Sequence, residues 1–420
     1  MGAWINFCLA TGRAGRPLSG YGCLTGQGNG QGGREHGQKA DQLPGYRKLV
    51  DPEARRHVAE VWGVDPDSLP GPGRSAYELL DALGTDIKSL LLMGSNPVVS
   101  APRAAHIEER IKSLDFLAVC DVVLSETAEL ADVVLPVTQW AEETGTTTNL
   151  EGRVLLRRRA ITPPEGVRSD LEIMHELAAR LGGERALEKG FPTDAEEVFE
   201  ELRRASAGGP ADYSGITYRR LAEENGVFWP CPAATGAADD AGDSEDASLD
   251  AGPDDPAQDH DADAAPHPGT PRLFLDRFAT PDGRARFAPV SHRASAEEPD
   301  DEYPVLLTTG RVVAQYQSGA QTRRVDELNN AAPGPFVELH PRLAARLGAA
   351  DGDPLAVISR RGRAVAPARI TTAIRPDTVF MPFHWPGEGR ANTLTNPALD
   401  PTSRMPEFKT CAVRVEPVQS

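Results

Sequence analysis

Short apolar segments alternate with amphipathic segments between residues 75 and 185. The apolar segments have the length of buried strands, and the amphipathic ones repeat apolar residues at the spacing of a helix. The predicted strands are Lys88–Met93, Phe116–Cys120 and Asp132–Val137, and the predicted helices are Pro102–Leu114, Ser125–Ala131 and Leu171–Leu181. Strands and helices that alternate in this way favour an α/β fold, here part of a doubly wound parallel sheet.

The periodicity changes after residue 270, where short apolar runs are separated by turn residues. The predicted strands are Arg272–Leu275, Ala285–Pro289, Pro304–Thr308, Pro354–Ser359, Ala364–Thr371 and Thr378–Pro382. One helix, Pro341–Leu347, interrupts them, and breaks such as Gly348 suit tight turns. This pattern favours a compact β-barrel over a second α/β domain.

Two segments have the composition of loops rather than of packed elements. Gly20–Gly45 is rich in glycine and polar residues and predicts a loop. Residues 233–269 are largely Ala, Asp, Gly and Pro, and predict a disordered acidic linker; an acidic interaction tail is the alternative. The predicted domains are a partial α/β domain over 1–232, the linker over 233–269 and a β-barrel domain over 270–420.

The net charge of -18 comes mostly from the predicted linker. Eleven Asp or Glu residues and no Lys or Arg lie between Asp239 and Asp263. The rest of the chain carries no basic stripe, so we expect no nucleic-acid partner. The apolar runs are too short to cross a bilayer, and the first residues carry neither a basic start nor a small-residue cleavage site. We therefore expect no membrane partner and a cytoplasmic location.

Motifs for catalysis and metal binding are absent from the sequence. No two cysteines have C-x-x-C spacing, so we expect reduced, mostly buried thiols at Cys8, Cys23, Cys120, Cys231 and Cys411. G-x-S-x-G, H-E-x-x-H and P-loop motifs are also missing. Isolated histidines are predicted to be structural or solvated rather than metal ligands at His36, His106, His340 and His384. The sequence assigns no catalytic residue and no metal ligand.

Polar residues follow the first two predicted strands of the sheet. Gly94 and Asn96 come directly after the first strand, and Asp121 comes after the second. Loops at the carboxyl ends of parallel strands open on the same edge, where a nucleotide-like ligand would bind. The alternative is that Gly94 and Asn96 only form a turn and that Asp121 only caps a helix.

Two further segments could bind phosphate groups. Gly28–Gly33 matches G-x-G-x-x-G, but no apolar strand leads into it and Arg34–Gly37 is a poor start for a helix, so it is a weak dinucleotide fingerprint. Thr308–Arg311 follows a predicted barrel strand and combines hydroxyl, glycine backbone and guanidinium groups, which suits an anion. Gln315–Ser318 comes just after it. A surface turn with a solvated arginine is the alternative.

Several blocks resemble the molybdopterin oxidoreductases of the dimethyl-sulfoxide-reductase superfamily, most of all bacterial assimilatory nitrate reductases. They occur in the family's order and cover nearly everything except the linker. The blocks are Thr25–Asn29, Gly32–Glu35, Met93–Pro97, Glu126-Thr127 through Ala131–Pro136, Thr148–Arg153, Leu307–Arg311, Met381–Trp385 with Asn392, and Pro406–Lys409 before Cys411–Val413.

The resemblance implies a molybdenum bis(molybdopterin guanine dinucleotide) cofactor between the α/β domain and a C-terminal double-psi β-barrel. In the α/β domain, the implied contacts to one guanine dinucleotide are Asn96, Asp121 and Asp170. In the barrel, the implied contacts to pterin and phosphates are Thr309, Gly310, Arg311, Gln317, Ser318, Phe383, Asn392 and Lys409. Asp121 and Asp170 would select guanine by accepting its N–H donors. Arg311 and Lys409 would offset the phosphate charge.

The resemblance also implies that the complete enzyme reduces nitrate to nitrite. The family's [4Fe-4S] cysteine motif and its Cys or Ser ligand to molybdenum are not found in this sequence. We therefore expect an N-terminal half or a separate subunit to supply them, a redox protein to donate electrons, and the isolated chain not to turn over nitrate. A formate dehydrogenase fragment, a non-catalytic dinucleotide-binding protein and a non-functional remnant stay open as alternatives.

Overall fold

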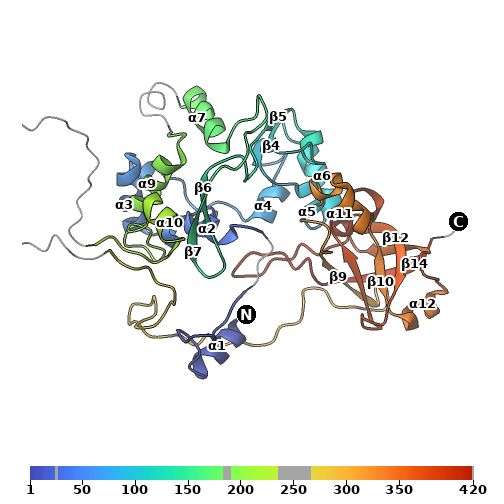
Figure 1. Ribbon diagram of the computed structural model, residues 1–420. Helices are drawn as coiled ribbons and strands as arrows, with labels where there is room; N and C mark the ends of the chain where they lie inside the picture. The colour runs from blue at the N-terminus through green and yellow to red at the C-terminus, as the bar shows by residue number, and fades with distance from the viewer. Residues whose placement is uncertain (24–26, 183–190, 235–265, 419–420) are drawn as a thin grey trace, which may run out of the picture. The chain divides into compact units, whose positions relative to one another are not determined.

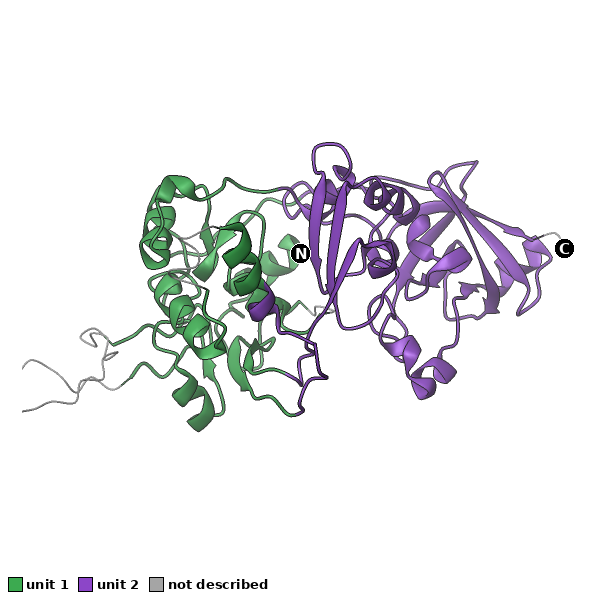
Figure 2. Ribbon diagram, turned by 90° about the horizontal axis from the view of Figure 1, so that it is seen from above, with its two compact units in different colours: residues 1–73, 143–160, 174–290 green, residues 74–142, 161–173, 291–420 purple. Residues whose placement is uncertain are grey.

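The computed structural model describes residues 1–23, 27–182, 191–234 and 266–418. The chain forms two compact units, shown in different colours in Figure 2. The first unit contains residues 1–73, 143–160 and 174–290, and the second contains residues 74–142, 161–173 and 291–420. Most of the predicted linker, residues 235–265, and residues Thr25 and Gly26 of the first family block lie outside the described residues. The predicted domain boundaries therefore stay predictions.

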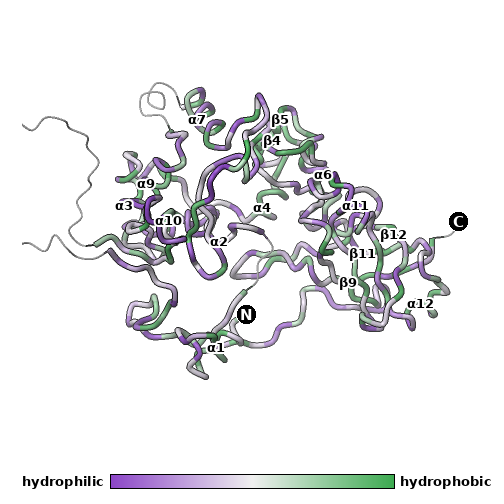
Figure 3. The backbone as a smooth tube through the Cα atoms, viewed as in Figure 1, coloured by the Kyte–Doolittle hydropathy of each residue, from purple (hydrophilic) through white to green (hydrophobic). Residues whose placement is uncertain are grey.

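A three-stranded parallel sheet in the second unit confirms the predicted α/β fold. It consists of β3 (Ser89–Met93), β4 (Phe116–Asp121) and β5 (Val133–Pro136). Because the strands pair in parallel, their carboxyl ends meet at one edge. The helical elements around it are α4 (Ala76–Asp81), α5 (Pro97–Ser100), α6 (Ala104–Lys112) and η3 (Ala128–Leu130). Helix α6 buries Ile107 and Ile111 in the same core cluster as β4, whose apolar character is visible in Figure 3.

A closed barrel, also in the second unit, confirms the predicted double-psi β-barrel. Its strands are β9 (Val305–Gly310), β10 (Val337–Leu339), β11 (Pro354–Ser359), β12 (Gly362–Ile370), β13 (Thr378–Pro382) and β14 (Cys411–Pro417). They follow the order β10-β12-β11-β14-β9-β13 around the barrel, with parallel pairs β9–β13 and β10–β12. Strands β9, β10, β12 and β14 are labelled in Figure 1. Burial alternates along β9, which turns Val305, Leu307 and Thr309 inward.

Helices of the barrel region start and stop where local signals place them. Helix α12 (Pro341–Leu347) has the predicted bounds: His340 caps its first turn, and Gly348 ends it with a φ of 66°. The shorter helical elements are η4 (Thr322–Arg324), α11 (Asp326–Ala331), η5 (Gly387–Gly389) and η6 (Ala391–Thr393).

Two predicted barrel strands are wrong. Arg272–Leu275 and Ala285–Pro289 form no strand and belong to the first unit. Their apolar residues pack locally instead: Leu273 contacts a core cluster of the first unit, and the ring of Phe274 stacks on that of Phe278. An apolar run becomes a strand only if another strand pairs with it, and pairing is not visible in the run itself.

The first unit packs helices with a small antiparallel sheet. Its sheet strands are β6 (Gly145–Thr148), β7 (Arg153–Arg157) and β8 (Val227–Phe228), and a two-stranded ribbon joins β1 (Gln42–Leu43) to β2 (Arg47–Lys48). The helical elements are α1 (Gly2–Ala10), α2 (Gly30–Glu35), η1 (Pro44–Tyr46), α3 (Pro52–Trp62), η2 (Pro66–Ser68), α9 (Ala195–Ser206) and α10 (Tyr218–Glu223). Helix α7 (Asp170–Leu181) confirms the helix predicted from its amphipathic pattern. It begins in the second unit and continues in the first.

Helix α2 corrects the prediction of an uninterrupted loop over Gly20–Gly45. Its last residue, Glu35, is buried and accepts hydrogen bonds from the hydroxyls of Thr148 (2.9 Å) and Tyr213. These tertiary contacts outweigh the low helix propensity of its glycines. Within the described ranges, no helix is both long and apolar enough to cross a membrane.

Candidate functional site

Three of the predicted ligand-binding residues gather at the carboxyl edge of the parallel sheet. Asn96 follows β3 and caps α5, and Asp121 ends β4. Asp170 begins α7, and Arg168, two residues before it, forms a parallel bridge with Val137 after β5. Burial raises the pKa of the Cys120 thiol and the charge of Asp170 raises it further, because the two groups lie close together. The topology thus brings Asn96 and Asp121 to one edge, as their places after parallel strands predict, and Asp170 lies near them.

The Asn96 side chain uses all its hydrogen-bonding capacity on other protein groups. Its Oδ1 accepts from the backbone N–H (3.2 Å) and the hydroxyl (2.7 Å) of Thr127. Its Nδ2 donates to Glu126 Oε2 (2.7 Å) and to Ser318 Oγ (3.2 Å). Asn96 is 7% exposed, so this amide joins the sheet edge to the barrel loop that carries Ser318.

The two carboxylates of the sheet edge differ in their surroundings. Asp121 is half-buried and accepts hydrogen bonds from the backbone N–H of Val122 (2.8 Å) and the hydroxyl of Ser125 (2.7 Å). These bonds hold the turn after β4, which agrees with the capping alternative. Asp170 is exposed at the N-terminus of α7. Asp170 is therefore the more accessible carboxylate of the pair.

A second group of predicted residues gathers at one edge of the barrel. Thr309 and Gly310 end β9, and Arg311 follows it directly. Phe383 follows β13, which is parallel to β9. Lys409 precedes β14, which is antiparallel to β9, so it reaches the same edge. Its Nζ donates to the carbonyl oxygen of Thr309 (3.0 Å), whose hydroxyl donates to the carbonyl oxygen of Phe408 (2.9 Å).

Arg311 and Lys409 make this edge of the barrel cationic. The Phe383 ring centroid lies 5.1 Å from the Arg311 guanidinium and 4.9 Å from the Lys409 ammonium. Desolvation, together with the charge of Arg311, lowers the pKa of Lys409 to about 8, although Lys409 is exposed. Among the residues described, neither cation forms an ion pair with a carboxylate. We call Arg311, Phe383 and Lys409 the cationic edge.

The loop after β9 adds polar groups to the cationic edge. Arg311 Nη2 donates to Gln317 Oε1 (3.1 Å), while Gln317 Nε2 is buried with no partner in the described part of the chain. His384 is fully buried: its Nε2 accepts from the backbone N–H of Val312 (2.9 Å), and its Nδ1 donates to the carbonyl oxygen of Gln317 (2.5 Å). Burial lowers the pKa of His384, so the imidazole is a neutral structural link, as predicted.

Asn392 lies at a different junction of the second unit. It is 2% exposed and donates through Nδ2 to the carbonyl oxygen of Val99 (2.9 Å), at the end of α5. Its Oδ1 accepts from the hydroxyl of Thr395 (3.2 Å). Asn392 therefore connects η6 to α5, and its role as a ligand contact stays a prediction.

The other three histidines that were considered as metal ligands have structural surroundings. Burial lowers the pKa of His36 to about 4, and His106 pairs with Asp81 at 2.6 Å. His340 caps α12. Over the described ranges, no group of three or more His, Cys, Asp and Glu side chains is arranged to hold a metal ion.

Comparison with known proteins finds two family matches in the chain. Residues 1–180 match the family described as Molybdopterin oxidoreductase, and residues 305–412 match the Molydopterin dinucleotide binding domain. The chain thus carries two domains that are typical of molybdopterin oxidoreductases. The second match spans the barrel, from the first residue of β9 into β14.

Curated relatives match almost the whole length of this chain. It is 43% identical to the assimilatory nitrate reductase catalytic subunit of Bacillus subtilis, over 99% of this chain and 54% of the relative. It is 40% identical to the F420-dependent formate dehydrogenase subunit alpha of Methanocaldococcus jannaschii, over 99% of this chain and 55% of the relative. The chain thus spans about half the length of the curated relatives it matches.

A solved structure shares the fold of this chain. Acetylene hydratase from Pelobacter acetylenicus superposes with a TM-score of 0.59 and 17% identity, covering 88% of this chain and 51% of that one. This likeness concerns the fold alone.

The cationic edge fits the chemistry of a molybdopterin dinucleotide. Such a cofactor is a polyanion. Within the described ranges the two cations have no carboxylate partners, and they lie beside a buried amide donor that has no partner there either, which suits phosphate oxygens. The lowered pKa of Lys409 indicates that its charge is poorly compensated within the protein itself. An anionic ligand would supply that compensation.

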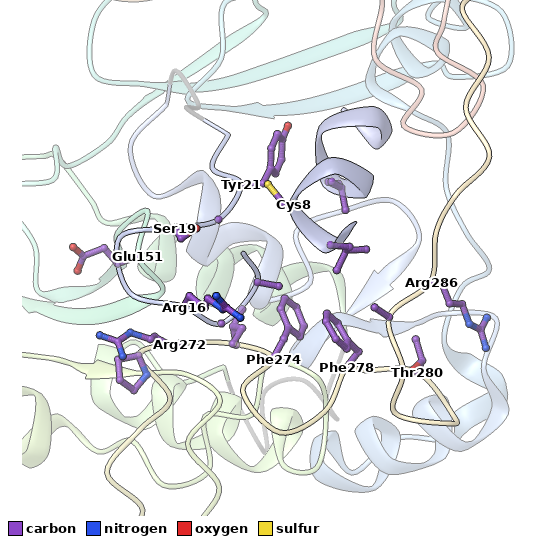
Figure 4. A pocket seen from close by; sticks show the side chains of 18 residues that line it. Cys8, Arg16, Ser19, Tyr21, Glu151, Arg272, Phe274, Phe278, Thr280 and Arg286 are labelled. Carbon is purple, nitrogen blue, oxygen red and sulfur yellow. The ribbon is translucent and has the colours of Figure 1, made fainter. Parts of the chain in front are cut away.

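A cavity in the first unit differs in chemistry from the cationic edge. Its volume is about 750 Å³, and Cys8, Tyr21 and the stacked rings of Phe274 and Phe278 line part of it (Figure 4). None of the predicted site residues is among the described residues that line it. The cationic edge therefore remains the candidate site.

Two residues of the site region were missed by the sequence interpretation. Glu126 and Arg323 form an ion pair at 2.5 Å between the turn after β4 and the loop after β9. Glu126 stands in a family block, and that was its only signal. Arg323 carried none, because its partner is 197 residues away in the sequence.

Proposed function

We propose that this chain binds one end of a molybdenum bis(molybdopterin guanine dinucleotide) cofactor in an oxidoreductase that reduces nitrate to nitrite. The cationic edge carries this proposal, because Arg311 and Lys409 flank Phe383 without carboxylate partners among the described residues. The 43% identity to an assimilatory nitrate reductase catalytic subunit supports nitrate as substrate.

The side chains of this chain bind and orient the cofactor in this proposal. Arg311 and Lys409 offset the phosphate charge, and Gln317 Nε2 donates to a cofactor oxygen. Asp121 and Asp170 accept N–H donors of the guanine base at the sheet edge. Phe383 keeps water from one side of the cations. When bound, the cofactor supplies the two-electron chemistry at molybdenum.

Other parts of the enzyme lie outside this proposal for the chain itself. A [4Fe-4S] cluster and the protein ligand to molybdenum would come from the portion of the relatives that this chain does not cover, or from a separate subunit. A redox protein would donate electrons, and the cytoplasm would be the site of the reaction.

Formate oxidation is the second candidate activity. The 40% identity to an F420-dependent formate dehydrogenase subunit alpha favours it, over the same extent of chain. Both candidates use the same proposed binding residues, so an assay of the whole protein must separate them.

The test uses the native protein that contains this chain, purified from its source. We expect acid hydrolysis to release GMP from it, and nitrate to oxidise a reduced chemical electron donor in its presence. Lys409→Met would lower the GMP content. A protein without bound GMP would refute the cofactor proposal. GMP with formate-dependent reduction and no nitrate activity would refute nitrate as the substrate.

A further inference from the structure

Glu126 and Arg323 form an ion pair with limited access to water. Arg323 Nη2 donates to Glu126 Oε1 at 2.5 Å, and the two side chains are 21% and 20% exposed. Burial alone would raise the pKa of Glu126, but hydrogen bonds from Arg323 and Asn96 lower it below its ordinary value. Glu126 is therefore ionised at neutral pH, and the pair is a charge-assisted contact within the second unit.

The Glu126 carboxylate also connects three separate segments of the second unit. Its Oε2 accepts from Asn96 Nδ2 (2.7 Å), which also donates to Ser318 Oγ (3.2 Å). The loop after β3, the turn after β4 and the loop after β9 are joined through this one group. Arg324 adds a parallel contact, since its Nη2 donates to the carbonyl oxygen of Leu124 (2.7 Å).

Arg323 packs against the backbone at Gly319, two residues after Gln317. A Cβ atom added to Gly319 would lie 2.9 Å from Arg323 Nε and 2.6 Å from the carbonyl oxygen of His384. His384 in turn bonds the carbonyl oxygen of Gln317 (2.5 Å), and Gln317 bonds Arg311 (3.1 Å). A displacement of Arg323 would therefore be transmitted to the cationic edge.

We propose that Glu126 and Arg323 are positioning residues: their ion pair holds the Gln317-Ser318 loop beside Asn96 and thereby sets the geometry in which the cofactor is held. Neither residue needs to touch the cofactor, since they act through Asn96 and Gln317. The statement that a cofactor is held rests on the proposed function, whereas the coupling between the three segments does not.

Variants of the pair separate this role from general stability. Glu126→Gln places an amide donor where two donors converge, and Arg323→Gln removes the cation, whereas Arg323→Lys keeps it. Glu108→Gln is the matched control. Glu108 forms a similarly buried ion pair with Arg390 (2.7 Å), which ties α6 to the η5–η6 segment and not to the loop after β9.

Hydrogen exchange and cofactor retention are the two measurements, both on the complete protein. In Glu126→Gln and Arg323→Gln we expect amide exchange over residues 315–324 to rise about tenfold, the effect of losing one charge-assisted bond. We expect release of bound dinucleotide, followed as GMP in the filtrate, to accelerate by a similar factor. Arg323→Lys should restore part of both, and Glu108→Gln should change neither.

The outcomes distinguish the two proposals. Unchanged exchange over 315–324 in Glu126→Gln would overturn the coupling, and faster exchange with unchanged GMP release from loaded protein would overturn the positioning role alone. A wild-type protein without dinucleotide would overturn the proposed function, and the positioning role with it. Faster GMP release in Glu108→Gln would also overturn the role, because it would show a general loss of stability.

Discussion

Lys409 makes anion binding at the cationic edge depend on pH. Its pKa falls from the ordinary 10.5 to about 8, mainly through desolvation and then through the charge of Arg311. Only the ammonium form attracts an anion, so the free protein must hold or take up this proton in order to bind. With a pKa of about 8, the ammonium fraction is about 0.9 at pH 7 and about 0.1 at pH 9. We expect anion affinity to fall about tenfold between these two values, which corresponds to about 1.4 kcal/mol.

The assay is equilibrium dialysis with radiolabelled sulfate, whose charge does not change over this range. Lys409→Arg keeps a cation that does not titrate below pH 12 or so, and should bind sulfate equally at both pH values. Lys409→Met should bind weakly throughout, and its residual binding measures non-specific contributions. Affinity should fall as pH rises in the wild type alone.

Two results would refute this reasoning. A wild-type affinity that is flat across the range would mean that the pKa of Lys409 is not lowered. The same fall in Lys409→Arg as in the wild type would mean that a different group titrates.

Three further predictions concern stability and loop geometry. Leu307→Ala, at a position 1% exposed in the barrel core, should lower the unfolding free energy by about 2–5 kcal/mol in urea titrations; a loss below about 1 kcal/mol would contradict the packing. Burial raises the pKa of Glu35, so the unfolding free energy should decline as pH rises from about 4.5 through the folded-state pKa. Urea unfolding midpoints measured across this pH range should show the decline in the wild type and a flatter dependence in Glu35→Gln. Gly319→Ala combines a φ of 75° with a contact of 2.6 Å to a backbone oxygen, whereas Gly348→Ala has a φ of 66° and open space. Thermal unfolding should show the larger loss for Gly319→Ala, and equal losses would argue against the close contact.

Local sequence signals were sufficient for much of the fold. The three strands of the parallel sheet were found because each is a short apolar run that the core surrounds. Helix α12 was found because Pro341 starts it and Gly348 ends it. Strands β10 and β14 were both missed, β10 because it has only three residues. Arg272–Leu275 was wrongly predicted because pairing depends on distant segments.

The candidate site was predictable only where topology alone gathers residues. Asn96 and Asp121 follow neighbouring parallel strands, so their proximity needs no side-chain information. The hydrogen bonds of the Asn96 side chain were not predictable, because one of its partners, Ser318, is 222 residues away in the sequence. The cationic edge combines residues after two strands and before a third, and only the closed barrel shows that these ends coincide.

Closure of the barrel also limits how other chains can associate with it. Each of the six strands pairs with a neighbour on both sides, and the pairing of β10 with β13 closes the ring. A sheet without a free edge offers no template for strand addition or for edge-to-edge aggregation. Any chain that associates with the barrel would therefore contact its side chains and loops. Substitutions at the barrel surface would then change such association while leaving the backbone pairing intact.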